Sequence, residues 1–183
     1  MRLDNDTYEE IKPAVVNMLV DYNIKGVPLD PFKIADKMGI AIHTYSAMDL
    51  PTRKKAYAYS SDGFSVEGKN NEWDIYYNDK KENGRIRQTI MHEIGHYYLG
   101  HTEEGEEEEA EARFFAKYAL AAPPLIHNMK KQITVENIME TFEVGYTAAK
   151  YAYAYYKKWM KYGEKDYLEY ETKMLEQLGI DIS

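Results

Sequence analysis

Apolar residues recur every three or four positions through much of the second half of the chain, and this spacing predicts amphipathic helices. Ile86, Ile90 and Ile94 share one side of such a helix. Asn83 can cap its beginning and Gly100 can end it, because asparagine favours the N-cap and glycine the C-cap. The sequence therefore predicts a helix of about four turns over this segment.

Helical spacing continues toward the C-terminal end. A helix is expected from about residue 107 to 121, where prolines at 123 and 124 stop it. Further helices are predicted at 125–131, 135–141, 146–162 and 166–178.

The first half of the chain mixes two periods. A capping box at Thr7 predicts a first helix, in which Pro13 requires a kink or a later start. Asp30 and Pro31 begin a short helix that Gly39 ends. Short β-rich runs predict strands at 40–45, 56–60, 64–67 and 73–78, with turns at 62–63 and 69–71. Helices, then a small antiparallel or mixed sheet, then helices again indicate an α+β fold.

The chain has 183 residues, which suits one domain. We expect a core over 1–125 and a helical C-terminal extension over 126–183 that packs on it as one unit. No stretch approaches the roughly 20 apolar residues of a membrane span, and the polar N-terminus lacks the apolar region of a secretion signal. Cysteine is absent from the sequence, which suits a reducing cytoplasm.

Negative charge is concentrated in one short segment. Seven glutamates between residues 103 and 111 account for seven of the eight net negative charges. The remainder of the chain is nearly neutral and has no basic excess, so a nucleic-acid partner is not expected.

The segment HEIGH at 92–96 carries the chemistry of a metal site. Residues four apart on a helix lie about 40° apart in azimuth and one turn apart in height, so His92 and His96 can aim two imidazoles at one point. Glu93 lies on the flank, where it can accept a proton from a zinc-bound water. By chance the pattern would occur roughly 0.015 times in a chain of this composition, so we interpret it as a zinc site.

A catalytic zinc site needs a third protein ligand. His101 follows His96 by five residues, which turns it 140° away on a continuing helix, so we expect it at the helix C-terminus instead. The small apolar face of the next helix, extended backward, reaches Glu109 and Glu108, while Glu111 falls on the adjacent side. Glu109 lies nearest the centre of that face, with the other two glutamates as alternatives.

Several segments resemble those of the ImmA/IrrE-like zinc metallopeptidases, which are gluzincins. The similarity covers about residues 18–151. It is carried by PLDPF at 28–32, WDIYYN at 73–78, RQTIMHEIGH at 87–96, EAEARFFAKY at 109–118 and AAPPL at 121–125.

The resemblance implies a zincin-type active-site helix that binds Zn²⁺. It assigns His92, His96 and Glu109 as ligands and Glu93 as general base. One position departs from the family pattern: Arg113 stands where asparagine or aspartate usually orients a ligand histidine. Arginine cannot accept the hydrogen bond that this role requires.

The resemblance also implies a partner. Such proteins are often encoded beside a helix-turn-helix repressor of a prophage or mobile element and cleave it. The expected function is therefore a zinc endopeptidase of restricted specificity. The competing class is a non-catalytic regulatory or protein-interaction module that contains zinc, and Arg113 is the feature that favours it.

Other segments have less specific interpretations. Strand 74–77 is expected to be the sheet edge that binds peptide. Arg87 can pair with a carboxylate, and segment 134–150 has a helix–turn–helix outline that we expect to pack on the zinc domain. The aromatic helix 146–162 should pack against the core, and His43 and His127 should be structural or surface residues.

Overall fold

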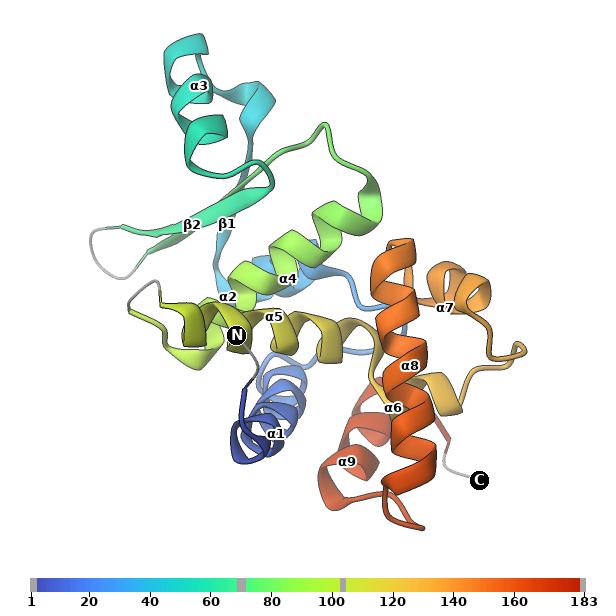
Figure 1. Cartoon of the computed structure of the whole chain (residues 1–183). Helices are drawn as coiled ribbons and strands as arrows, with labels where there is room; N and C mark the ends of the chain where they lie inside the picture. The colour runs from blue at the N-terminus through green and yellow to red at the C-terminus, as the bar shows by residue number, and fades with distance from the viewer. Residues whose placement is uncertain (1–2, 69–71, 103–104, 182–183) are drawn as a thin grey trace.

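The computed structural model describes residues 3–68, 72–102 and 105–181, in which one small sheet lies toward one end of a mostly helical molecule (Figure 1). The helices are α1 (Asn5–Asp21), α2 (Pro31–Met38), α3 (Leu50–Tyr59), α4 (Asn83–Leu99), α5 (Glu106–Ala121), α6 (Pro123–His127), α7 (Val135–Phe142), α8 (Tyr146–Tyr162) and α9 (Glu169–Leu178), with a short 3₁₀ turn η1 (Tyr45–Ala47). The α+β prediction is confirmed. The turn predicted at 69–71, like Glu103 and Glu104, lies outside the described residues.

The sheet is mixed and has the strand order β1-β3-β2. Strand β1 (Ala41–Thr44) runs parallel to β3 (Trp73–Tyr77), and β2 (Gly63–Glu67) runs antiparallel to β3. The prediction that 74–77 is an edge strand is wrong, because β3 pairs on both sides. The strand at the edge nearer to α4 and α5 is β2, which Gly63 begins.

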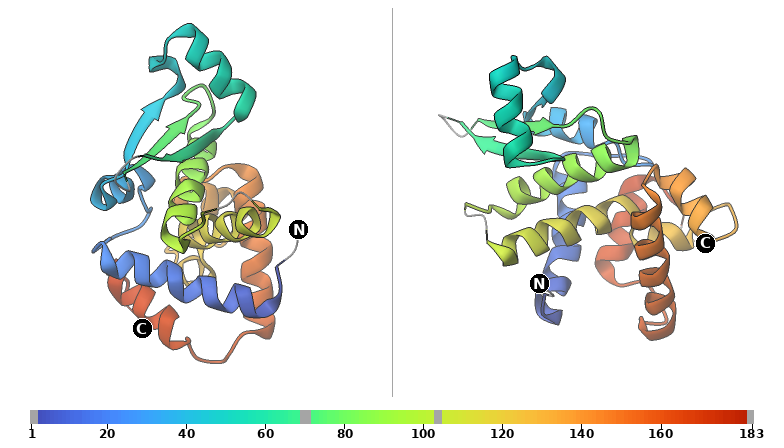
Figure 2. Two further views of the ribbon diagram at one scale, coloured as in Figure 1. Left: turned by 90° about the vertical axis from the view of Figure 1, so that its left-hand side faces the viewer. Right: turned by 45° about the horizontal axis from the view of Figure 1, so that its top comes forward.

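Helices α4 and α5 lie side by side beneath the sheet (Figures 1 and 2). Helix α4 ends at Gly100, whose φ of 72° gives the left-handed C-cap that the sequence predicts. Between the two helices Gly95 faces Ala112, and a Cβ on Gly95 would lie 3.3 Å from the Ala112 backbone. The small residues at this contact therefore let the two backbones approach closely.

Residues 56–60 form the end of helix α3 and not the predicted strand. Alternating Ala56, Tyr57, Ala58 and Tyr59 imitate the two-residue period of a strand. The helix begins earlier, where the side chain of Asp49 caps it by accepting from the backbone N–H of Thr52. Helix α3 stands at the far end of the sheet, away from α1 and α9 (Figure 1).

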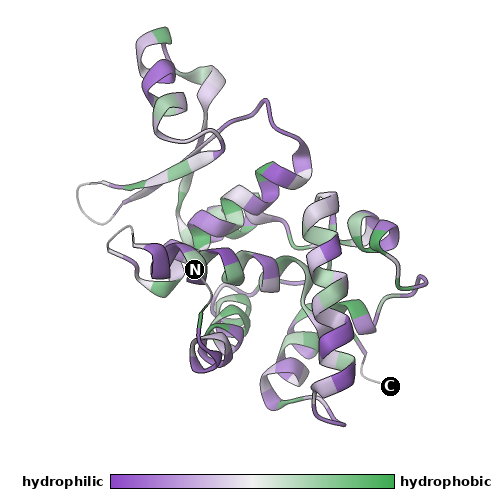
Figure 3. Ribbon diagram, in the orientation of Figure 1, coloured by the Kyte–Doolittle hydropathy of each residue, from purple (hydrophilic) through white to green (hydrophobic). Residues whose placement is uncertain are grey.

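The C-terminal helices share one hydrophobic core with the rest of the chain. Phe142 of α7, Ala152 of α8 and Leu175 of α9 are buried in the same cluster as Val15 and Phe115. Figure 3 shows apolar positions on the inner sides of these helices and polar positions outside. A boundary near residue 125 stays a prediction. Among the described residues, no helix combines the length and hydrophobicity that crossing a membrane requires.

The turn between α7 and α8 packs against the beginning of α4. The buried Arg87 guanidinium donates to the backbone carbonyl of Leu29 and forms an ion pair with Glu143, with Nη1 3.0 Å from Oε2. Gly84 approaches the same turn so closely that an added Cβ would lie 2.5 Å from the Gly145 nitrogen. Arg87 thus pairs with a carboxylate, as the sequence allowed, and that carboxylate belongs to the helix–turn–helix segment.

Candidate metal centre

The two histidines of the HEIGH segment lie one turn apart on α4 with both imidazoles turned toward α5. Their Nε2 atoms are 3.2 Å apart, and the ring planes cross at 87°. His96 is buried, whereas His92 is partly exposed. The arrangement presents two nitrogen lone pairs to one small volume at the surface of α4.

Helix α5 brings a carboxylate to the same volume. Oε2 of Glu109 lies 3.4 Å from His92 Nε2, and Oε1 lies 3.2 Å from His96 Nε2. These residues form the one group of three possible metal-binding side chains that the described part of the chain contains. Of the three glutamates considered from the sequence, the fold brings Glu109 to the histidines.

The donor set and its spacing fit zinc. Tetrahedral ligands at the usual distances of about 2.0–2.1 Å from zinc lie about 3.3–3.4 Å from one another. The two Nε2 atoms are 3.2 Å apart, and the nearer Glu109 oxygen lies 3.2 Å from His96 Nε2 (Oε1) and 3.4 Å from His92 Nε2 (Oε2), separations close to this spacing. Three protein ligands also leave a fourth position for water or substrate, which is typical of catalytic and not of structural zinc sites.

The protonation states of two of these side chains suit a cation. Burial lowers the pKa of His96 to about 4, so its imidazole is neutral at neutral pH. The hydrogen bond with His92 lowers the pKa of Glu109 to about 2, so its carboxylate is ionised. Metal ligands must be deprotonated to bind, and both groups already are.

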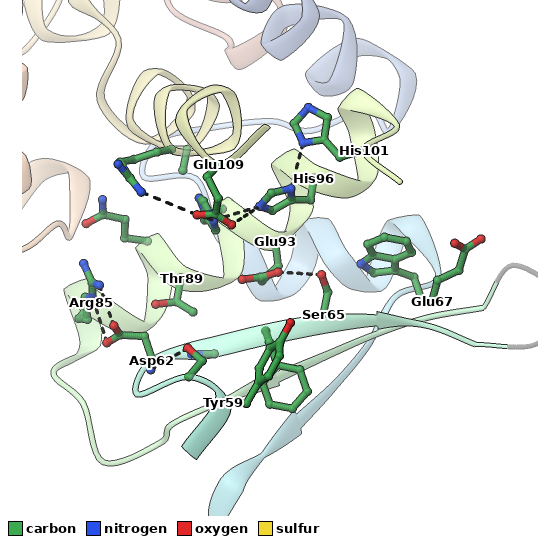
Figure 4. A pocket seen from close by; sticks show the side chains of 18 of the residues that line it. Tyr59, Asp62, Ser65, Glu67, Arg85, Thr89, Glu93, His96, His101 and Glu109 are labelled. Carbon is green, nitrogen blue, oxygen red and sulfur yellow. Dashed lines mark hydrogen bonds and ion pairs between the residues drawn. The ribbon is translucent and has the colours of Figure 1, made fainter. Parts of the chain in front are cut away.

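Glu93 lies beside this group and faces the sheet. The hydroxyl of Ser65, on β2, donates to Glu93 Oε2 over 2.7 Å (Figure 4). Glu93 is only 7% exposed, so the hydrogen bond fixes its carboxylate between α4 and β2. This places a buried carboxylate at the floor of the cleft, and its role as a general base stays a prediction.

An open cleft of about 570 Å³ contains the whole group. Strand β2 lines one side of the cleft, and α4 and α5 line the other (Figure 4). At one end Arg85 donates twice to Asp62, over 3.1 and 2.8 Å, which lowers the pKa of Asp62 to about 2. This ion pair ties the beginning of β2 to the beginning of α4 and keeps that wall of the cleft in place.

Arg113, the position that departs from the family pattern, also lines the cleft. Its guanidinium lies 3.7 Å from Glu109 Oε2, one turn back on α5. Arg113 therefore brings a positive charge to the Glu109 carboxylate. The usual residue of the family at this position would instead accept a hydrogen bond.

Two interactions in and beside the cleft did not follow from sequence reasoning. Ser65 alternates with Phe64 and Val66 in β2, which places it on the side of the sheet that faces α4, but only the three-dimensional arrangement identifies Glu93 as its partner. His101 does not cap α4 with its side chain. Its imidazole contacts His96 and Glu111, and its backbone N–H makes the capping bond.

A family model described as the IrrE N-terminal-like domain matches residues 35–153 of the chain. The matched region includes the whole sheet, both helices of the candidate centre and all of the cleft-lining residues. No curated protein shows a significant match to the sequence.

Proposed function

Because the chain belongs to the ImmA/IrrE family of zinc metallopeptidases, we propose that it is a zinc-dependent endopeptidase with a restricted set of protein substrates. In this proposal His92, His96 and Glu109 hold the zinc and Glu93 is the general base. The observation that carries it is the meeting of these three donors beside the Glu93 carboxylate in one open cleft.

Zinc, when bound, supplies Lewis acidity that polarises a peptide carbonyl and makes a neighbouring water more acidic. Glu93 accepts the proton that the water loses as its oxygen bonds to the carbonyl carbon. The same carboxyl group then delivers a proton to the amide nitrogen as the C–N bond breaks. The hydrogen bond from Ser65 to Oε2 helps to hold the Glu93 carboxylate in place for this exchange.

Strand β2 is the proposed binding edge for the substrate. Among the described residues it pairs with β3 and with no other strand, and it lines the cleft. An extended peptide can add to such an edge through main-chain hydrogen bonds, which would lay its carbonyl groups over the floor of the cleft. The proposed peptide-binding edge is therefore Gly63–Glu67 and not 74–77.

A helix-turn-helix repressor of a prophage or mobile element is the substrate that the family resemblance favours. Peptide-edge binding suits such a substrate, because the segments that join small domains are extended and exposed. We expect the site of action to be the cytoplasm, where such a repressor would be found.

Glu93→Gln tests the catalytic role. The change keeps the shape of the side chain but removes its basicity, so zinc should stay bound while cleavage falls by at least about 100-fold, the usual contribution of a general base. The chain would be incubated with the repressor encoded beside it, and cutting would be followed by intact mass with and without a chelator. A mutant that cuts at the wild-type rate would remove Glu93 from the mechanism.

Arg113 supports one alternative, a zinc-containing regulatory or interaction module without peptidase activity. Its guanidinium forms an ion pair with Oε2 of Glu109, the oxygen that faces His92. The positive charge beside this oxygen makes it a weaker metal ligand. Arg113→Asn restores the usual residue of the family. A gain of cleavage in Arg113→Asn over an inactive wild-type chain would favour the module, whereas cleavage by the wild type would exclude it.

A further inference from the structure

The chain leaves the helical path immediately after α4 and folds back against the last turn of that helix. Gly100 adopts the left-handed conformation, and the backbone N–H of His101 then donates to the carbonyl of His96 over 3.0 Å. This C-cap folds His101 back over the last turn of α4 instead of carrying it away from the ligand face. His101 Nδ1 consequently lies 2.9 Å from His96 Nδ1.

A carboxylate completes the chain of contacts. His101 Nε2 lies 2.9 Å from Oε2 of Glu111, which reaches across from α5. The imidazole of His101 is only 8% exposed and the side chain of Glu111 is 23% exposed. The chain His96–His101–Glu111 thus joins α4 to α5 from largely buried positions behind the candidate centre.

The positions of the nitrogens fix the direction of these hydrogen bonds. His96 Nε2 faces Glu109 and His92, so as a metal ligand it must carry no proton, and the proton of the neutral ring is on Nδ1. His96 Nδ1 then donates to His101 Nδ1, which places the His101 proton on Nε2, facing Glu111. Each donor therefore meets an acceptor, and the chain ends on a negative charge.

We propose that His101 and Glu111 are positioning residues that set the tautomer and orientation of His96 for metal binding. The proposal rests on the zinc site described under the proposed function and deepens it. A hydrogen-bond acceptor behind a ligand histidine fixes its ring and makes its free nitrogen a better donor to the metal. With Arg113 unable to accept, His101 supplies an acceptor at the neighbouring ligand histidine, and Glu111 holds His101 in the required tautomer.

Zinc affinity of three variants tests this assignment. His101→Phe keeps a planar ring without hydrogen bonds, His101→Asn returns an acceptor near the position of Nδ1, and Glu111→Gln removes only the charge. The dissociation constant for zinc would be measured by competition with a chromophoric chelator, and melting of the zinc-free proteins would report on folding. His43→Phe, an exposed histidine of β1 outside the cleft, is the control, and Glu109→Ala marks the loss of a proposed ligand.

His101→Phe should weaken zinc binding by about 10- to 100-fold, the usual effect of losing such a partner. His101→Asn should return to within about threefold of wild type, and Glu111→Gln should bind about three- to tenfold more weakly. His43→Phe should bind as the wild type does, and Glu109→Ala should bind more weakly than any of the three.

Unchanged affinity in His101→Phe, or equal weakening in His101→Phe and His101→Asn, would overturn the positioning role. If His101→Phe does not fold, Glu111→Gln decides, and wild-type affinity in that variant would also overturn it. Failure of the wild-type chain to bind zinc would instead overturn the proposed function, so the two failures are distinguishable.

Discussion

Glu93 reaches the cleft from α4, but Ser65 on the facing strand determines where its carboxylate lies. The hydrogen bond of 2.7 Å joins a neutral donor to a buried acid, and bonds to charged groups are among the stronger ones in proteins. This hydrogen bond restricts rotation about the side-chain torsions of Glu93. The orientation of the proposed base therefore depends in part on Ser65, which is not one of the proposed metal ligands.

Ser65→Ala should lower kcat by about tenfold, which corresponds to about 1.4 kcal/mol, and leave the zinc dissociation constant unchanged. Steady-state cleavage of the repressor and chelator competition would measure the two quantities. Ser46→Ala, an exposed serine of η1 outside the cleft, should match the wild type in both. A kcat equal to that of wild type in Ser65→Ala would show that the orientation of Glu93 has another source.

Some residues of the candidate site could be predicted from the sequence and others could not. His92, Glu93 and His96 follow from one helical spacing, and Glu109 follows from the small apolar face of α5, because both arguments use positions on a single helix. Ser65 and His101 make their contacts with residues of other elements. No local sequence pattern predicts such contacts. The side chain of His101 was misplaced because the reversal at Gly100 redirects it.

Among the elements, the contact between α4 and α5 decides the geometry of the centre. Gly95 lies between His92 and His96 in the sequence, and its missing side chain lets Ala112 come close. Glu109 is three residues before Ala112 and is thereby held at ligand distance. A larger residue at 95 would separate the histidines from the carboxylate.

Gly95→Ala should reduce both stability and zinc affinity. The new methyl group would meet the Ala112 backbone at 3.3 Å and the Phe115 ring at 3.2 Å. Overpacking of this kind costs about 1–3 kcal/mol, which exceeds the gain of about 1 kcal/mol from helix propensity. Thermal melting and chelator competition would measure the changes. Gly68→Ala, whose methyl group would make only ordinary contacts at 3.5 Å and beyond, is the matched control, and a Gly95→Ala protein as stable as wild type would contradict the prediction.

Helices were easier to predict than the sheet. Apolar periodicity and Gly100 located α4 and α5 to within one residue at most ends, although the N-cap of α4 is Glu82 and not the predicted Asn83. The alternation at Ala56–Tyr59 concealed a helix that begins with Asp49 and Pro51. The central place of β3 depends on its parallel pairing with β1, and the paired residues Ala41 and Asp74 are far apart in the sequence. Such long-range pairing leaves no periodic signal in either strand.

For the molecule as a whole, the turn between α7 and α8 is joined to the beginning of α4, the helix that carries the candidate ligands. Arg87 is buried at the beginning of α4 and reaches both the Leu29 carbonyl and Glu143 in the turn before α8. Removing one partner of a largely buried ion pair leaves the other charge without compensation. The turn between α7 and α8 therefore supports the helix that carries HEIGH.

Glu143→Ala should lower the free energy of unfolding by about 1–2 kcal/mol, less than for a fully buried pair because Glu143 is half-exposed. Glu140→Ala in α7, which removes an exposed ion pair with Lys131, should change it by no more than about 0.5 kcal/mol. Urea unfolding of both variants gives the comparison. Equal effects would mean that Arg87 gains little from Glu143.

Because the outer edge of β2 has no strand partner among the described residues, it can bind a substrate as an added strand. The rate of the proposed cleavage then depends on how readily the substrate unfolds locally. Main-chain groups along a sheet edge can join only a stretch of polypeptide whose own amides are unpaired. The backbone amides of a DNA-binding helix are hydrogen-bonded within the helix. Such a helix therefore cannot bind to the edge of β2 until it unfolds locally. If the chain cleaves a repressor as proposed, turnover should follow local unfolding of the repressor around the cut site, and conditions that loosen that segment would trigger cutting without any change in the enzyme.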